Sequence, residues 1–210
     1  MMATYHNVNI IAKEGQWHIF LAFIPFALSV YLGFCSFLIY LFFALFAFSV
    51  YFFRNPEREI ADDTAGSVLA PVDGRVEAIE RLEGEKKILV RIQNGLLPTH
   101  ILRSPFKTEI TSIKRRHGMA LVGGEESVEH LNSRCDVTFT NGVEMKVTAS
   151  LFPYAPGCQF KPGDTLRHGQ RIGFIFTGTV DIYLPFQTDL RINLGDTLRA
   201  SESLIAIIKE

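Results

Sequence analysis

Four short segments of the sequence hold the side chains that could do chemistry. In chain order they are Tyr51–Arg58, Ala70–Val76, His100–Pro105 and Gly173–Asp181. Together they contain a carboxylate, an imidazole, a guanidinium and a hydroxyl, groups with which proteins move protons, hold anions and attack carbonyl carbons. The candidate residues are Asp73, His100, Arg103 and the pair Gly178-Thr179.

Each candidate also has an ordinary interpretation when it is taken alone. Asp73 precedes Gly74, and aspartate followed by glycine is typical of a β-turn. His100 stands beside a proline-containing segment where a surface histidine is common, and Arg103 reads as a solvated charge. Thr179 suits a plain β-strand. The local sequence leaves both interpretations open, so the surrounding elements have to decide between them.

A long apolar run precedes most of the candidates. The 37 residues from Trp17 to Phe53 contain no Asp, Glu, Lys or Arg. A membrane-spanning helix needs about 20 apolar residues, so the run predicts a tight helical hairpin in the membrane. Its helices are expected at about Trp17–Leu32 and Ser36–Phe53, with the turn at Gly33. A single tilted span and a hairpin lying in the membrane plane are the alternatives.

Positive charges flank this run, with Lys13 before it and Arg54 after it. By the positive-inside tendency, both ends are expected on the cytoplasmic side of the inner cell membrane. The predicted organisation is an N-terminal cytoplasmic segment over 1–16, a membrane hairpin over 17–53 and a β domain over 54–210.

The overall charge excludes one class of function. With 21 basic and 22 acidic side chains, the net charge is −1, which argues against a nucleic-acid binder held by phosphate contacts. The basic cluster Lys114–His117 would attract anionic lipid by about 1 kcal/mol per residue, with a solvated loop as the alternative. The three cysteines form neither a disulfide framework nor a CxxC metal motif.

The chain beyond residue 54 predicts a mainly β domain. Short stretches alternate apolar with polar residues and are separated by turn formers: Gly74–Ile79, Lys87–Ile92, Asp136–Thr140 and Val143–Thr148. Asn141-Gly142 predicts a hairpin between the last two stretches. A short helix is expected at 125–132.

An internal echo adds detail to this fold. Gly163–Arg167 returns as Gly195–Arg199, and an apolar stretch follows each copy, which predicts two quasi-equivalent β-hairpins. Together with Ala70–Val76, the pattern resembles barrel-sandwich hybrids, some of which carry lipoyl or biotinyl groups. Such a carrier presents its lysine in a tight hairpin, whereas Lys146 lies inside a predicted strand, so a membrane-tethered carrier is a weaker alternative.

The order and spacing of the four segments resemble the short bacterial and archaeal form of the phosphatidylserine decarboxylase proenzyme family. The specific elements are the Tyr-Phe-Phe-Arg-x-Pro-Glu-Arg exit at 51–58 and Pro-x-Asp-Gly at 71–74. The resemblance implies a membrane-associated carboxy-lyase of phospholipid biosynthesis, made as a zymogen, that converts phosphatidylserine to phosphatidylethanolamine. In that family the proenzyme cuts itself at a Gly-Ser bond, and the new terminal residue becomes a covalent pyruvoyl group that serves as the electron sink. The resemblance implies no metal.

The resemblance also implies roles for the candidates. Asp73 matches the acid that supports self-cleavage, and His100 matches a candidate proton donor after decarboxylation. Arg103 would meet the lipid phosphate or carboxylate. The partners implied are an anionic phospholipid in a membrane and a heterodimer of large and small chains, or a homodimer. Cleavage would make the 32 residues from Thr179 the small chain.

The sequence departs from the family at the processing bond, where Gly178-Thr179 stands in place of Gly-Ser. Counting forward from Gly173 places Thr179 on the family serine, whereas counting back from Val180–Pro185 places Gly178 there, so one residue has been deleted beside the bond. A threonine hydroxyl can attack the preceding carbonyl, and its product would be a 2-oxobutanoyl group with one more methyl than pyruvoyl. Two outcomes stay open: a working decarboxylase with this cofactor, or an unprocessed, inactive lipid-binding relative.

Overall fold

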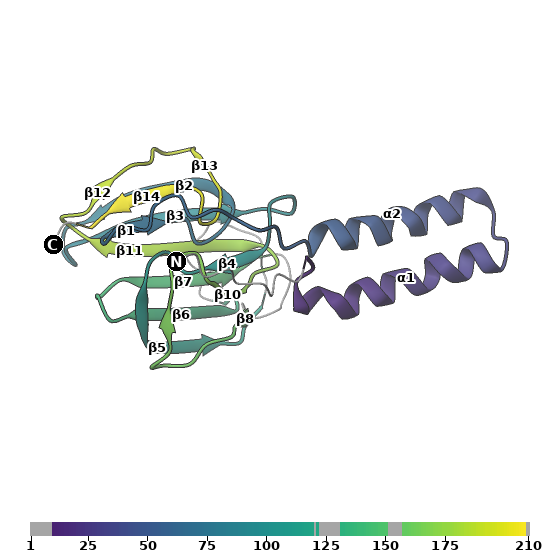
Figure 1. Ribbon diagram of the computed structural model, residues 1–210, viewed down its shortest axis with the longest axis horizontal. Coiled ribbons are helices and arrows are strands. Elements are labelled where there is room, and N and C mark those ends of the chain that lie inside the picture. The colour runs from purple at the N-terminus through teal and green to yellow at the C-terminus, as the bar shows by residue number, and fades with distance from the viewer. Residues whose placement is uncertain (1–9, 120, 122–130, 151–156, 209–210) are drawn as a thin grey trace, which may run out of the picture. The chain divides into compact units, whose positions relative to one another are not determined.

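The computed structural model describes residues 10–119, 121, 131–150 and 157–208, with only the backbone of 157–158. The chain divides into two compact units, Met1–Glu57 and Arg58–Glu210. The described part of the first unit is a helical hairpin, and the second is built from β-sheets (Figure 1). The helix predicted at 125–132 lies almost wholly outside the described residues.

The hairpin follows the prediction closely. A 3-10 turn, Lys13–Gly15, leads into α1, Gln16–Tyr31, and α2 spans Ser36–Phe52. Between them the chain reverses at Gly33, whose φ of 65° lies in the left-handed region that glycine enters at no steric cost. The two helices and their turn are therefore confirmed.

Aromatic rings hold the two helices together. The ring centroids of Phe23 and Phe46 lie 5.5 Å apart, as do those of Phe26 and Phe43, with tilted planes. Contacts of this kind are worth about 0.5–1.5 kcal/mol beyond the area they bury.

The spanning role predicted for the hairpin is not supported. Within the residues that the structure describes, no helix is both long enough and apolar enough to cross a membrane. α1 has 16 residues and α2 has 17, or about 25 Å each at about 1.5 Å per residue, whereas the hydrocarbon core of a bilayer is about 30 Å thick. The apolar run is divided between two helices and their turn, which leaves each helix short.

The second unit is mainly β, as predicted. In chain order its described strands are β1 Ser67–Leu69, β2 Gly74–Leu82, β3 Lys87–Asn94, β4 Ile101–Arg103, β5 Thr108–Arg116, β6 Arg134–Phe139, β7 Glu144–Ala149, β8 Gly157–Cys158, β9 Thr165–Leu166, β10 Arg171–Phe174, β11 Gly178–Pro185, β12 Asp189–Leu190, β13 Thr197–Leu198 and β14 Leu204–Ile207. The four predicted strands appear as β2, β3, β6 and β7. The predicted hairpin turn also forms, with Gly142 at a φ of 77°.

These strands form three antiparallel sheets. The largest has the order β13-β2-β3-β11-β7-β6-β5-β9, and the two small sheets have the orders β1-β14-β12 and β4-β10-β8. Among the described strands, β13 and β9 end the large sheet without pairing to each other, so the sheet is open. The closed barrel expected of a barrel-sandwich hybrid is therefore not seen, because each of these two-residue strands pairs with a single neighbour.

The two halves of the large sheet repeat each other. Read inward from its two ends, β13-β2-β3-β11 corresponds to β9-β5-β6-β7, and the small sheets correspond as β1-β14-β12 to β4-β10-β8. Two reciprocal hydrogen bonds join the halves, since the Leu69 N–H donates to the Pro105 carbonyl and the Arg103 N–H to the Pro71 carbonyl, each at 2.7 Å. The chain thus inserts one complete repeat, β4 to β10, between β3 and β11 of the other.

The sequence echo marks equivalent places in these repeats. Its two copies form β9 and β13, at opposite ends of the large sheet. The Asp164 carboxylate accepts from the Lys161 N–H at 2.8 Å, and the Asp196 carboxylate accepts from the Asn193 N–H at 2.7 Å, so the two turns close alike. The predicted equivalence is confirmed, but the copies are not hairpins, because β9 pairs with β5 and β13 with β2.

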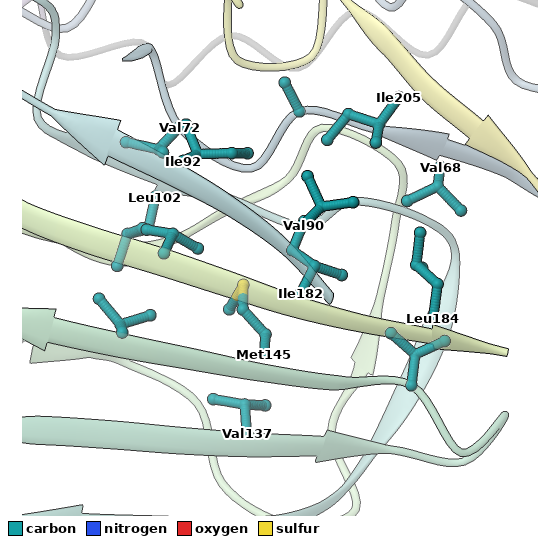
Figure 2. Close-up of a cluster of buried hydrophobic side chains, with 14 of the residues drawn as sticks. Val68, Val72, Val90, Ile92, Leu102, Val137, Met145, Ile182, Leu184 and Ile205 are labelled. Atoms are coloured by element: carbon teal, nitrogen blue, oxygen red, sulfur yellow. The ribbon is translucent and has the colours of Figure 1, made fainter. Parts of the chain in front are cut away.

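The core lies between the large sheet and the small ones. Figure 2 shows Val90, Ile182 and Met145 of the large sheet beside Leu102 of β4 and Ile205 of β14. All five are buried, and burying an apolar side chain of this size contributes about 1.5–3 kcal/mol. The core fixes which face of each strand points inward, and therefore where the candidate residues lie.

Candidate active site

The Gly178-Thr179 bond opens β11, a central strand of the large sheet (Figure 1). Gly178 pairs with Asn94 of β3 and with Ala149 of β7. Its φ of 152° is one that side-chain-bearing residues rarely adopt, and a Cβ here would collide with the Thr148 carbonyl oxygen. Glycine is therefore the one residue tolerated at the position before the candidate nucleophile.

The Asp73 carboxylate binds three groups from distant parts of the chain. Oδ2 accepts from Arg58 Nη2 at 2.7 Å and from the Thr99 hydroxyl at 2.8 Å, while Oδ1 accepts from the Ala200 N–H at 2.7 Å. The residue is buried. These bonds reach well beyond the turn in which Asp73 stands, so the β-turn interpretation does not account for it.

Asn94 connects Asp73 with the candidate bond, and the sequence analysis missed it. Its side-chain amide donates to the backbone carbonyls of Asp73, at 2.7 Å, and Thr99, at 3.0 Å, while its backbone pairs with Gly178. Asn94 Oδ1 is buried and has no hydrogen-bond partner among the described residues. In the sequence, Asn94 before Gly95 looks like an ordinary strand end, so no local signal marks it.

His100 is fully buried, at 0% exposed, so the surface interpretation is wrong. Its ring stacks on that of Phe174 with centroids 5.9 Å apart, and its carbonyl accepts from the Ile175 N–H at 2.9 Å. These contacts hold the imidazole beside the segment that leads into β11, next to Thr99.

Arg103 is half-buried rather than solvated. Its Nη1 donates to the Gly169 carbonyl at 3.1 Å. Burial lowers the pKa of Arg103, the positive charges of Arg58 and Arg171 lower it further, and Asp73 raises it. Arg103 therefore belongs to a cluster of charges that includes Asp73.

Thr179 lies on the opposite face of β11 from Gly178. Side chains alternate along a strand, and Val180 and Ile182 of β11 point into the core, so Thr179 belongs to the outer face. It is half-buried there, with Gln93 and Thr148 as its register neighbours.

The structure thus brings only some of the candidates together. Gly178 shares its face with its register partner Asn94, whose amide holds the carbonyls of Asp73 and Thr99. These groups lie on the core side of the bond, whereas the Thr179 side chain points to the other side. Gly178 and Thr179 lie on opposite faces because neighbouring residues of a strand point to opposite sides of the sheet.

The carrier interpretation finds no support in the position of Lys146. This residue lies within β7, between its register partners Asp136 and Asp181, and its ammonium is 4.2 Å from the Tyr183 ring centroid. It is not in a hairpin turn. Across the described part of the chain, no three His, Cys, Asp or Glu side chains group as metal ligands would.

Comparison with known proteins decides the family. The family model for phosphatidylserine decarboxylase matches residues 45–206. The chain belongs to the phosphatidylserine decarboxylase family. Relatives named phosphatidylserine decarboxylase proenzyme come from Desulfotalea psychrophila, 30% identical over 94% of this chain and 96% of that protein, from Oleidesulfovibrio alaskensis, 31% identical over 84% of each chain, and from Nitrosomonas europaea, 29% identical over 98% and 99%. No solved structure matches.

The phosphatidylserine decarboxylase family is a family of carboxy-lyases that act on phospholipid through a covalent pyruvoyl group. In one respect the residues around the bond fit such a group. Only glycine fits the backbone at residue 178, and the Asn94 side-chain oxygen, an acceptor without a hydrogen-bond partner among the described residues, lies beside it. They differ in another, because residue 179 is threonine and its side chain lies on the outer face.

Proposed function

We propose that this chain is a self-processing decarboxylase that converts phosphatidylserine to phosphatidylethanolamine, with Thr179 as the source of its ketoacyl group. The observation that supports this most is the backbone at Gly178, which excludes any side chain and lies next to the Asn94 amide that holds Asp73. A glycine carbonyl followed by a hydroxyl is the arrangement that self-cleavage needs.

The proposed processing converts the Gly178-Thr179 amide first to an ester and then to two separate chains. The Thr179 hydroxyl attacks the Gly178 carbonyl carbon, so an ester replaces the amide and the nitrogen of residue 179 becomes a free amine. Elimination then releases the Gly178 carboxylate. Water next replaces the nitrogen of residue 179, which leaves as ammonia, and a 2-oxobutanoyl group remains at residue 179. Serine at the same position would leave pyruvoyl, one methylene smaller.

The surrounding side chains have proposed roles in this chemistry. Asp73 accepts hydrogen bonds from Arg58, Thr99 and Ala200, and it orders the core side of the bond. His100, buried against Phe174, is the proposed proton donor after loss of carbon dioxide. Arg103 is the proposed contact for the anionic headgroup. When present, the ketoacyl group supplies the electron sink.

We also propose that the hairpin attaches the chain to the inner cell membrane, with its basic ends on the cytoplasmic side. Trp17, Phe37 and Tyr40 are 67%, 73% and 72% exposed, and apolar side chains gathered in this number mark a membrane or protein contact. Flotation with phospholipid vesicles tests this, and we expect replacement of Phe37 and Tyr40 by serine to weaken binding. Unchanged flotation would contradict the assignment.

The decisive experiment is the intact mass of the detergent-solubilised protein under denaturing conditions. Two chains, one ending at Gly178 and one starting with a ketoacyl residue 179, would support the decarboxylase. Thr179→Ala should abolish cleavage and leave the fold intact, whereas Thr179→Ser should give a small chain one methylene lighter. A single 210-residue chain from active membranes would instead favour the unprocessed lipid-binding relative.

A further inference from the structure

Three arginines and two carboxylates meet beside the end of β4. Arg58 joins the two acids, since Nη2 donates to Asp73 Oδ2 at 2.7 Å and Nη1 to Glu202 Oε1 at 3.1 Å. Arg103 ends β4, and its register partner Arg171 begins β10. The charges of the other four residues all act on Arg103. We call these five residues the arginine cluster.

The arginine cluster has more positive than negative charge. Three guanidinium groups against two carboxylates leave a surplus of one positive charge. Because Arg103 and Arg171 are register partners on adjacent strands, their charges repel each other, and a shared anion would relieve that repulsion.

The cluster also contains an unused donor. The Arg58 side chain is only 12% exposed, and its Nε is buried with no hydrogen-bond partner among the described residues. A buried donor costs free energy until an acceptor meets it. Guanidinium groups match the paired oxygens of phosphate in geometry as well as charge. An anion with several oxygens therefore suits this place better than a neutral ligand.

We propose that the arginine cluster binds the phosphodiester of a glycerophospholipid headgroup, with Arg103 and Arg171 as ligands and Arg58 Nε as a further donor. This rests on the proposed function and specifies its substrate contact. The cluster shares Asp73 with the candidate bond, because the Asp73 carbonyl accepts from Asn94, the register partner of Gly178. A phosphate held in the cluster thus fixes the rest of the headgroup with respect to that bond.

The test uses the uncleaved Thr179→Ala chain, full length and in detergent, so that it does not depend on processing. Glycerophosphoserine and inorganic phosphate are titrated separately by calorimetry. We expect glycerophosphoserine to bind more tightly than inorganic phosphate. Arg103→Gln and Arg171→Gln should each weaken it about ten- to hundredfold, the value of a hydrogen bond to a charged group.

The matched control is Arg191→Gln, which removes an exposed arginine paired with Asp189 and outside the cluster; it should leave affinity unchanged. Arg103→Lys, which keeps the charge but loses the planar fork, should bind with intermediate affinity and serves if Arg103→Gln does not fold. Equal affinity for inorganic phosphate, or unchanged binding in both glutamine variants, would overturn the proposal. Because the bond is intact in every sample, failure here is distinct from failure to self-cleave.

Discussion

The Arg58 guanidinium lies 2.7 Å from the Asp73 carboxylate, and the two side chains are only 12% and 10% exposed. A charge left alone in so little solvent is costly, so removal of one partner from a buried pair typically destabilises a protein by about 3–5 kcal/mol. We expect Asp73→Asn to lower the free energy of unfolding by about 3 kcal/mol, since Arg58 keeps Glu202 as a second partner. Urea unfolding of the Thr179→Ala chain measures this without interference from cleavage.

The matched control is Asp189→Asn, which breaks the exposed pair between Asp189 and Arg191. Exposed pairs contribute about 0–1 kcal/mol, so the loss should be small. Equal losses of unfolding free energy in the two variants would show that the buried Asp73 pair stabilises the protein no more than an exposed pair does.

A second prediction concerns the backbone before the candidate nucleophile. Gly178→Ala places a Cβ against the Thr148 carbonyl oxygen at a φ of 152°, and overpacking alone costs about 1–3 kcal/mol. We expect lower stability and loss of self-cleavage. Gly84→Ala is the control, because a Cβ at Gly84 has no neighbour within 4 Å. Normal cleavage in Gly178→Ala would mean that this backbone is not required.

The sequence predicted well what depends on local periodicity. The apolar run predicted both helices, and the alternation of apolar and polar residues predicted β2, β3, β6 and β7. Both signals are local, because the apolar pattern of a helix or a strand repeats every few residues. The GDTLR echo marked the two repeats for the same reason, since each copy is a local turn. The spanning role was predicted from the same apolar run, whereas none of the described helices is long and apolar enough to cross a membrane.

The site was less predictable because its contacts are distant in sequence. Ala200, which donates to the Asp73 carboxylate, is 127 residues away, and Asn94 is 21 residues away. No spacing rule relates such positions. Arg58 entered the sequence analysis only as the end of the Tyr51–Arg58 segment, and Arg171 was not singled out, since a lone arginine reads as solvated until its burial is known.

A third prediction follows from the register of β11. Strand pairing from Val180 onward anchors β11 against β3 and β7, so an alanine inserted between Thr179 and Val180 should move Thr179 to the place of Gly178, where a Cβ collides with the Thr148 carbonyl oxygen. We expect lower stability and slower self-cleavage, because only glycine fits that backbone. The rate is followed by the appearance of the small chain on denaturing gels.

Two controls accompany the insertion. The same alanine placed between Phe186 and Gln187, both exposed in the turn after β11, should leave the rate unchanged. The β11 insertion combined with Thr179→Ala should give no cleavage. An unchanged or faster rate in the insertion variant would show that the reaction does not depend on glycine at this place in β11.

The last prediction concerns what holds the two chains together after cleavage. The small chain would begin at Thr179 within β11, whose residues 179–185 pair with β3 and 179–183 pair with β7. It would also supply β14, which lies between β1 and β12. Separation would therefore expose the core, so segments 1–178 and 179–210 should co-elute in native conditions even when co-expressed as separate chains. Ile182→Ala, which removes a fully buried side chain, should weaken this association by about 2–5 kcal/mol, measured by the denaturant concentration that separates the segments. Gln187→Ala, at an exposed position, should not, and segments that elute apart would contradict the central place of β11.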